Sequence, residues 1–454
     1  MPLSLLQVMK ALGVVYHLQR RARNNIRVLV LDNCNNPIRI DQDLQNIFAK
    51  GELCNEKLMI NGMPLDASNV MGVVVSGSRM VVAANRITAP HQIQLIGLDS
   101  SSTALSNRND YPYFGRMVPP DNIQMEVIAK VLQANDWSYV GVIYSQESYG
   151  VNGYRNLQKI INDKKYSCIG VAVGVNPYDT SEDIRSAVRT IAAENGVNVI
   201  VVIAVNTRQV LEAVEAEGLE DRFVLVGGDA WGPTRDIVKG FERMNASTNM
   251  NFQGAITIGF RDAIYEPIAQ QPYGFLTFLT SMSPSNRLGL PDAWFEDVYQ
   301  TIRKCRIAGA TVPTEYTEIC DGASINQQDI RDTGIGLRPL GAAELLSAGL
   351  ADFLDYYTCN TKSFAQCISE AAGRRKGLFE KTLEQDWTLQ ETDVLPQGLF
   401  KPELGEDRYW DSGYTVYTLG VKQEPGLPQP EREHNSKYYY SEVSTLFHLI
   451  SQLY

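Results

Sequence analysis

Short apolar runs rich in β-branched residues recur along this chain, and segments with helical spacing separate them. A strand that is buried on both faces shows such a continuous apolar run, and helices must then cover both faces of its sheet. The pattern predicts an α/β fold with doubly wound, mainly parallel sheets. The runs that carry this prediction are residues 26–31, 70–75, 93–98, 139–144, 168–175, 197–205, 223–226 and 254–259.

Helical spacing of apolar residues is clearest in the segments between these runs. The helix predicted to begin at Ser181 has acidic residues in its first turn, which is a good start signal. After about residue 260 helices dominate, and strand-like alternation returns only near the end. We predict helices over residues 121–134, 181–193, 209–217 and 342–356, and a strand within 409–421.

Length and charge limit what the chain can be. A single core stops growing at about 250 to 300 residues, so 454 residues predict two domains. The net charge of -11 argues against a nucleic-acid partner, whose phosphates need a basic surface. Without an apolar run of 18 residues, no membrane span is expected. Residues 1–16 lack a basic start and a small-residue cleavage site, so we interpret them as a helix of the fold and not as a signal peptide.

Polar side chains follow several of the predicted strands. In open parallel sheets, ligands bind beyond the carboxyl ends of the strands. Residues 76–79 and 99–103 are rich in hydroxyl groups and lead into helices, which suits an anion such as a carboxylate. Tyr149 and Asp229 follow two other strands and suit an ammonium group. Together they match an α-amino acid, although each segment alone is more often a turn or a helix cap.

Catalytic motifs are not visible, so we predict that the chain is not an enzyme and expect no cofactor or metal. There is no nucleophile elbow and no phosphate-binding loop. Gly334 and Gly336 resemble the start of a dinucleotide fingerprint, but no buried strand leads into them. The four histidines are scattered, and no pair of cysteines has the spacing of a zinc site.

Residues 111–153 contain the motifs Tyr-x-Tyr-Phe, Val-Pro-x-Asp, Trp-x-Tyr-Val and Ser-Tyr-Gly-x-x-Gly, and Gly-Asp-Ala-Trp follows at 228–231. This combination resembles the metabotropic glutamate receptors, which are class C G-protein-coupled receptors. The resemblance implies a bilobal Venus-flytrap region of the type found in periplasmic binding proteins. Lobe 1 would comprise residues 1–120 and 257–400, without its usual first strand, and lobe 2 would comprise residues 121–256 and 401–454.

The resemblance also implies a ligand site. The family holds the amino-acid carboxylate with hydroxyl groups, which Ser100 and Ser102 match, and the ammonium with Asp121, Tyr149 and Asp229. A further family serine is replaced by Arg79, and the basic residues that hold the distal carboxylate of glutamate are replaced near Val8 and near Gly334 or Ile335. We therefore expect an amino acid or small amine other than glutamate. Further candidate ligand residues are Ser78, Arg79, Ser101 and Trp231.

The seven cysteines fit the same family pattern. The resemblance implies disulfides Cys305–Cys320 and Cys359–Cys367, and an intersubunit disulfide through Cys54. Cys34 and Cys168 would pair with cysteines outside this sequence, which suggests a fragment or an incomplete gene model. Asn245 begins a glycosylation sequon.

The family resemblance predicts the extracellular ligand-binding region of a plasma-membrane receptor, which closes on its ligand and forms a homodimer through lobe 1. Membrane and G-protein contacts would come from cysteine-rich and seven-helix domains that this sequence lacks. Two alternatives stay open. One is a soluble periplasmic-type binding protein or decoy, and the other is the peptide-binding region of a receptor guanylate cyclase.

Overall fold

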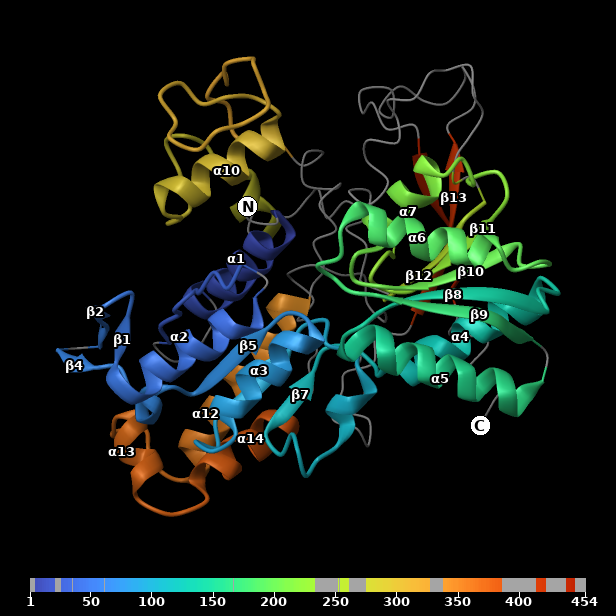
Figure 1. Cartoon of the computed structure of the whole chain (residues 1–454). Helices are drawn as coiled ribbons and strands as arrows, with labels where there is room; N and C mark the ends of the chain where they lie inside the picture. Colours follow the sequence, from blue (N-terminus) through green and yellow to red (C-terminus); the bar gives the residue numbers. More distant parts are fainter. Residues whose placement is uncertain are drawn as a thin grey trace. The chain divides into compact units, whose positions relative to one another are not determined.

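The computed structural model contains two compact units (Figure 1). Unit 1 comprises residues 1–100, 105–118 and 262–411, and unit 2 comprises residues 101–104, 119–261 and 412–454. Each unit is described by itself below. The structure describes residues 5–20, 26–34, 36–60, 62–165, 167–232, 252, 254–260, 275–326, 338–385, 414–421 and 438–445.

Unit 2 is built on a seven-stranded sheet with the order β14-β13-β12-β11-β10-β8-β9. The strands from β8 to β12 pair in parallel, whereas β13 and β14 add an antiparallel edge. All carboxyl ends of the parallel strands therefore lie at one edge of the sheet. The strands are β8 (Tyr139–Ser145), β9 (Cys168–Val175), β10 (Val199–Ile203), β11 (Val224–Gly227), β12 (Ile256–Phe260), β13 (Tyr414–Val421) and β14 (Tyr438–Thr445).

Helices cover both faces of this sheet, with α6 and α7 on one face and α4 and α5 on the other (Figure 1). Ile200 and Val202 of β10 belong to the core under α6 and α7, while Ile203 contacts Gly153 of α5. The apolar run of β10 is thus explained by burial on both sides. The helices are α4 (Asp121–Ala134), α5 (Ser148–Lys164), α6 (Ser181–Ala192) and α7 (Thr207–Ala216).

Unit 1 contains a three-stranded parallel sheet with the order β5-β6-β7. Val75 and Leu95 pack with α2 and α3 on one face, while Val74 and Ile96 pack with α1 and α12 on the other. The elements are β5 (Gly72–Val75), β6 (Gln94–Gly97), β7 (Phe114–Arg116), α1 (Leu5–Arg20), α2 (Pro37–Lys50), α3 (Ser78–Thr88) and α12 (Arg338–Tyr356).

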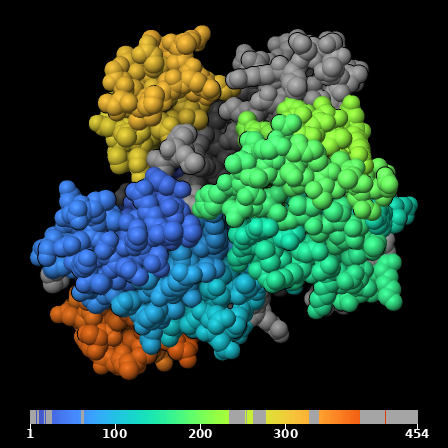
Figure 2. Space-filling model, viewed as in Figure 1, coloured from blue at the N-terminus to red at the C-terminus, as the bar shows by residue number. Residues whose placement is uncertain are grey.

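The smaller elements of unit 1 surround this sheet. Residues 275–326, yellow in Figures 1 and 2, form a subregion whose helix α10 packs against α1. The remaining elements are β1 (Glu52–Leu53), β2 (Glu56–Lys57), β3 (Met59–Ile60), β4 (Met63–Pro64), η1 (Ala67–Asn69), η2 (Thr103–Ser106), α9 (Phe275–Thr280), α10 (Asp292–Arg303), α13 (Phe364–Ser369) and α14 (Arg374–Leu383).

The predicted α/β class with mainly parallel sheets is confirmed, and most of the predicted strands are present. One strand prediction was wrong, because residues 26–31 form no strand. The side chains of Ile26 and Val28 instead pack against apolar residues of α1 and α12. Burial against these helices, and not strand pairing, explains why this segment is apolar. The short strand β7 was not predicted. The predicted N-terminal helix is confirmed as α1, whose residues Val8 and Leu12 are buried in the core of unit 1.

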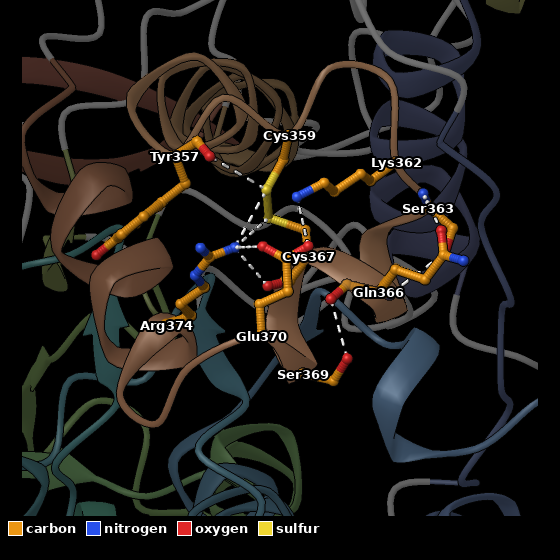
Figure 3. Close-up of a disulfide and its surroundings, with 9 residues drawn as sticks. All are labelled: Tyr357, Cys359, Lys362, Ser363, Gln366, Cys367, Ser369, Glu370 and Arg374. Atoms are coloured by element: carbon orange, nitrogen blue, oxygen red, sulfur yellow. Dashed lines mark hydrogen bonds and ion pairs between the residues drawn. A yellow bond between two sulfur atoms is a disulfide. The ribbon is translucent and has the colours of Figure 1, made fainter.

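Both intrachain cysteine pairs, Cys305–Cys320 and Cys359–Cys367, are disulfides in the structure. Figure 3 shows the second of these beside Arg374, whose guanidinium donates to the carbonyl of Cys367 at 2.8 Å. The same guanidinium lies 4.8 Å from the centre of the Tyr357 ring and pairs with Glu370 at 2.9 Å. This polar cluster ties α13 to α14, and it includes a disulfide whose sulfur atoms are buried.

Cys34, Cys54 and Cys168 are exposed thiols. Their predicted partners outside the chain stay predictions, and the sequon residue Asn245 lies outside the described residues. Across the part of the chain that the structure describes, no helix is both long enough and apolar enough to cross a membrane.

The packing of α5 on the end of β8 depends on Gly150. A Cβ at this position would lie 2.2 Å from the backbone oxygen and 2.5 Å from the backbone nitrogen of Ser145, and neither atom can move freely. We predict that Gly150→Ala lowers the free energy of unfolding by about 1–3 kcal/mol or more. Gly153→Ala on the same helix is the control, because its Cβ would meet side-chain atoms and no backbone, of Ile203 at 2.7 Å and Met125 at 3.8 Å. Chemical denaturation of both variants tests this, and equal losses would contradict the prediction.

Candidate functional site

Asp121 is the first residue of α4, and it is fully buried. Pro120 precedes it in an extended conformation, and the backbone N–H of Asp121 donates to the carbonyl of Ser101 at 2.7 Å. A carboxylate in the first turn of a helix is stabilised by the partial positive charge there. The hydrogen bond also joins the start of α4 to residues 101–104, which the structure groups with unit 2.

Tyr149 lies in the first turn of α5, where Glu147 caps the helix. The Glu147 carboxylate accepts from the backbone N–H groups of Tyr149 at 2.8 Å and Gly150 at 2.9 Å. The close contact of Gly150 with Ser145 then fixes this turn against the end of β8. Tyr149 is only 5% exposed, so its hydroxyl is held inside unit 2.

Asp229 follows β11 by two residues, and its carboxylate accepts a hydrogen bond of 3.4 Å from the hydroxyl of Ser101. Gly228, between the strand and Asp229, lies under two polar side chains. A Cβ at 228 would be 2.6 Å from the amide oxygen of Gln124 and 2.7 Å from the hydroxyl of Tyr149. Only glycine therefore lets both oxygen atoms approach the backbone at this sheet edge.

The electrostatics of this group are acidic. Burial raises the pKa of the Tyr149 hydroxyl well above its ordinary value, and the carboxylates of Asp229 and Asp121 raise that pKa further. Tyr149 therefore keeps its proton at physiological pH and remains neutral between two acids. Two carboxylates, a neutral phenol and an aromatic ring together favour a cation. No cluster of side chains able to hold a metal ion occurs among the described residues.

Gln124 is a member of this group that the sequence analysis did not include. It lies one turn after Asp121 on α4, is fully buried, and neither atom of its side-chain amide has a hydrogen-bond partner. Residues three apart on a helix share a face, so the spacing from Asp121 was the available signal. A buried amide without partners is costly, so Gln124 is a further candidate ligand residue.

The three serines after β6 face different ways. Ser100 is buried in unit 1 against Gly97, where a Cβ on the glycine would lie 2.9 Å from the serine hydroxyl. Ser101 faces Asp229, and Ser102 bonds to the hydroxyl of Ser148 at 2.8 Å and to its carbonyl at 3.0 Å. The structure thus brings Ser101 to Asp229 and Ser102 to Ser148, while the buried hydroxyl of Ser100 has no hydrogen-bond partner among the described residues. The predicted ligand roles of all three stay predictions.

Arg116 positions the start of this serine segment. Its side chain is fully buried in unit 1 and donates to the carbonyl of Ser100 at 3.2 Å and to the hydroxyl of Ser106 at 2.7 Å. A buried guanidinium needs such acceptors because an unpaired charge is expensive to desolvate. Arg116 therefore fixes the path of the backbone between β6 and η2.

The sequence predicts that the start of α3 offers hydrogen-bond donors to an anion. In the structure, the carboxylate of Asp99 accepts hydrogen bonds from these donors. The hydroxyl of Ser76 lies 2.9 Å and 2.7 Å from the two carboxylate oxygens of Asp99, and the backbone N–H of Gly77 donates to the first of these at 2.5 Å. Ser78 and Arg79 follow as the first two residues of α3, and both interact within the chain. Their ligand roles also stay predictions.

Two of the remaining candidates lie in the apolar cores of the two units. Trp231 is fully buried in the core of unit 2, where its ring covers Gly227. Val8 is buried in the core of unit 1, which leaves no basic side chain at that position. Gly334 and Ile335 lie outside the described residues.

Comparison with known proteins identifies the family of this chain. A family model described as the receptor family ligand-binding region matches residues 21–286, which is more than half of the chain. Metabotropic glutamate receptor 6 of Oryctolagus cuniculus is 25% identical over 263 residues, which cover 57% of this chain and 28% of that protein. The Drosophila melanogaster metabotropic glutamate receptor is 25% identical over 326 residues, or 69% of this chain and 31% of that protein. Metabotropic glutamate receptor 6 of Rattus norvegicus is 24% identical over 263 residues, which cover 57% of this chain and 28% of that protein.

The chain belongs to the family of receptor ligand-binding regions. The predicted resemblance to metabotropic glutamate receptors is confirmed, and the relatives named above are receptors and not enzymes. The match spans only about three tenths of the length of each of these receptors.

The environment of Tyr149 gives a prediction for alkaline pH. Because the folded protein raises the pKa of this hydroxyl above its usual value near 10, the unfolded chain releases the proton first. Stability then falls as pH rises above about 10. We predict a smaller fall in Tyr149→Phe, measured by chemical denaturation between pH 8 and about 11. Parallel profiles for the two proteins would contradict the assignment.

Proposed function

We propose that this chain is the extracellular ligand-binding region of a class C receptor, which closes on an amino acid or related amine. The observation that carries the proposal is the convergence of Asp121, Tyr149 and Asp229 in unit 2. Three segments far apart in the sequence supply an aromatic ring, a neutral hydroxyl and two carboxylates. A primary ammonium group is the ligand that such a set recognises by charge and hydrogen bonding.

The same convergence favours a small amine over a peptide. A receptor guanylate cyclase region would need no meeting of these three residues, whereas in this chain Asp121 and Tyr149 are buried together with Gln124 and the half-buried Asp229 acts on Tyr149. We also infer that the region is not an enzyme. Its acids lie beside a phenol and an amide, and no nucleophile–base pair was found in the sequence.

Glutamate itself is not the ligand that we propose. Val8 is an apolar core residue at the place where the resemblance expects an arginine, so it supplies no charge for a distal carboxylate. The amine-recognising residues are retained, while this distal contact is not. The ligand class is therefore an amine-bearing molecule whose remaining part differs from that of glutamate.

The assembly of the full receptor is part of the same proposal. Cys54 lies at the turn between β1 and β2, is exposed, and has a φ of 51°, so the hairpin presents the thiol to solvent. This placement supports an intersubunit disulfide and a homodimer through lobe 1. We propose that the lobes follow the predicted boundaries at residues 120, 256 and 400. G-protein coupling at the plasma membrane would depend on cysteine-rich and seven-helix domains beyond this sequence.

Removing the charge of Asp229 tests the amine site. A hydrogen bond to a charged group contributes about 1.5–3 kcal/mol, so Asp229→Asn should weaken amine binding by about ten- to a hundredfold. The measurement is a thermal-shift screen of the twenty amino acids and common biogenic amines, followed by calorimetric titration of the hits. Asp163→Asn is the control, because Asp163 is an exposed acid on α5.

Equal binding by wild type and Asp229→Asn would contradict the proposed site. If no compound raises the melting temperature of a protein shown to be folded, amine recognition is contradicted altogether and a peptide ligand is favoured.

A further inference from the structure

Gln124 adds a neutral hydrogen-bond acceptor to the acidic group of unit 2. Its side chain is fully buried on α4, and neither atom of its amide has a hydrogen-bond partner among the residues that the structure describes. An unpaired buried amide costs about as much free energy as a lost hydrogen bond, so proteins rarely keep one in a core. An apolar side chain of the same size would be more stable at this position unless a ligand pairs with the amide.

The amide oxygen of Gln124 lies over the same loop as the hydroxyl of Tyr149. A Cβ on Gly228 would be 2.6 Å from the amide oxygen and 2.7 Å from the phenol oxygen, so both oxygens approach one point of the backbone. Asp229 is the next residue, and its carboxylate acts on the Tyr149 hydroxyl. The amide of Gln124 therefore belongs to the group of polar atoms that contains Tyr149 and Asp229.

Asp121 joins these atoms from the same face of α4. Residues three apart on a helix share a face, so the side chains of Asp121 and Gln124 lie on one side of α4. The carboxylate of Asp121 also acts on the Tyr149 hydroxyl. Ser101 links the two acids, because its carbonyl accepts from the N–H of Asp121 at 2.7 Å and its hydroxyl donates to Asp229 at 3.4 Å. All five residues belong to unit 2, so the group is defined within one compact unit.

A primary ammonium has three N–H donors, and this group offers two carboxylates and one amide oxygen to receive them. We propose that Gln124 accepts the third N–H of the ligand's amine, and that the site therefore selects primary amines over N-methylated amines. The inference rests on the proposed function, because it presumes that Asp121, Tyr149 and Asp229 recognise an amine. An N-methyl group would replace one N–H and leave a buried acceptor facing carbon, which is a costly mismatch.

Pairs of probes that differ by one N-methyl group test this selectivity on the full chain. Calorimetric titration compares tyramine with N-methyltyramine, phenethylamine with N-methylphenethylamine, alanine with N-methylalanine and glycine with sarcosine. For any pair that binds, we expect the primary amine to bind at least about tenfold more tightly, because the methylated amine lacks one hydrogen bond of a charged group. Equal binding within a pair, or tighter binding of the methylated probe, would overturn the inference.

Gln124→Met separates hydrogen bonding from steric exclusion. Methionine has a similar volume but no amide, so we expect the affinity for the primary amine to fall by about tenfold or more and the affinity for its N-methylated partner to fall less. The preference for the primary amine should then largely disappear. An unchanged preference in this variant would show that the site rejects the methyl group by size, and it would overturn the role of Gln124.

The same variant gives a readout that needs no ligand. Because methionine removes an unpaired buried amide, we expect Gln124→Met to raise the melting temperature of the free protein by about 2 °C or more. Gln300→Met is the matched control. Gln300 is also buried, on α10, but its amide donates to the carbonyl of Val312 at 3.2 Å and accepts from the N–H of Ile307 at 2.9 Å.

The control variant should lower the melting temperature and leave the preference for primary amines unchanged. If Gln124→Met lowers the melting temperature as much as Gln300→Met does, the amide of Gln124 is a structural group and the inference is wrong.

The outcomes separate this inference from the proposed function. If both members of a pair bind equally and Asp229→Asn weakens the binding of both, the amine site stands and selection by Gln124 fails. If no probe binds the folded protein, the proposed function and the inference both fall.

Discussion

Parallel pairing of the strands is the constraint on which the rest of the structure depends. It places every carboxyl end of β8, β10 and β11 at one edge of the sheet in unit 2. Tyr149 and Asp229 follow two of these ends, and their meeting is a consequence of strand order and not of sequence proximity. The same rule in unit 1 brings Asp99, after β6, to Ser76, after the neighbouring strand β5.

Glycine completes this arrangement where side chains must approach the backbone closely. Gly150 allows the first turn of α5 to contact the end of β8, and Gly228 allows Gln124 and Tyr149 to lie over the loop after β11. These two glycines allow polar side chains to gather into a defined group at this edge of the sheet. The polar group is thus held by rigid elements, which lowers the cost of ordering it around a ligand.

Much of the fold could be predicted from the sequence because burial on both faces leaves a continuous apolar run. The helix α4 was predicted with its observed bounds, since Pro119 and Pro120 end the preceding segment and the apolar spacing ends at Ala134. The strand β7 was missed because three residues carry no periodicity.

The directions of the side chains after β6 could not be predicted, since a loop has no fixed alternation that would show that Ser101 and not Ser100 faces Asp229. Gln124 could have been found from its spacing to Asp121, but its lack of partners is visible only in three dimensions.

The disulfide between Cys359 and Cys367 has a kinetic consequence. Both residues are fully buried, and the guanidinium of Arg374 lies 3.3 Å from each sulfur atom. A reducing thiolate must reach one sulfur directly, so the folded region blocks its attack. Reduction then has to wait for a local opening of the α13–α14 region, and the lifetime of this bond reflects the stability of that region more than the strength of the reductant.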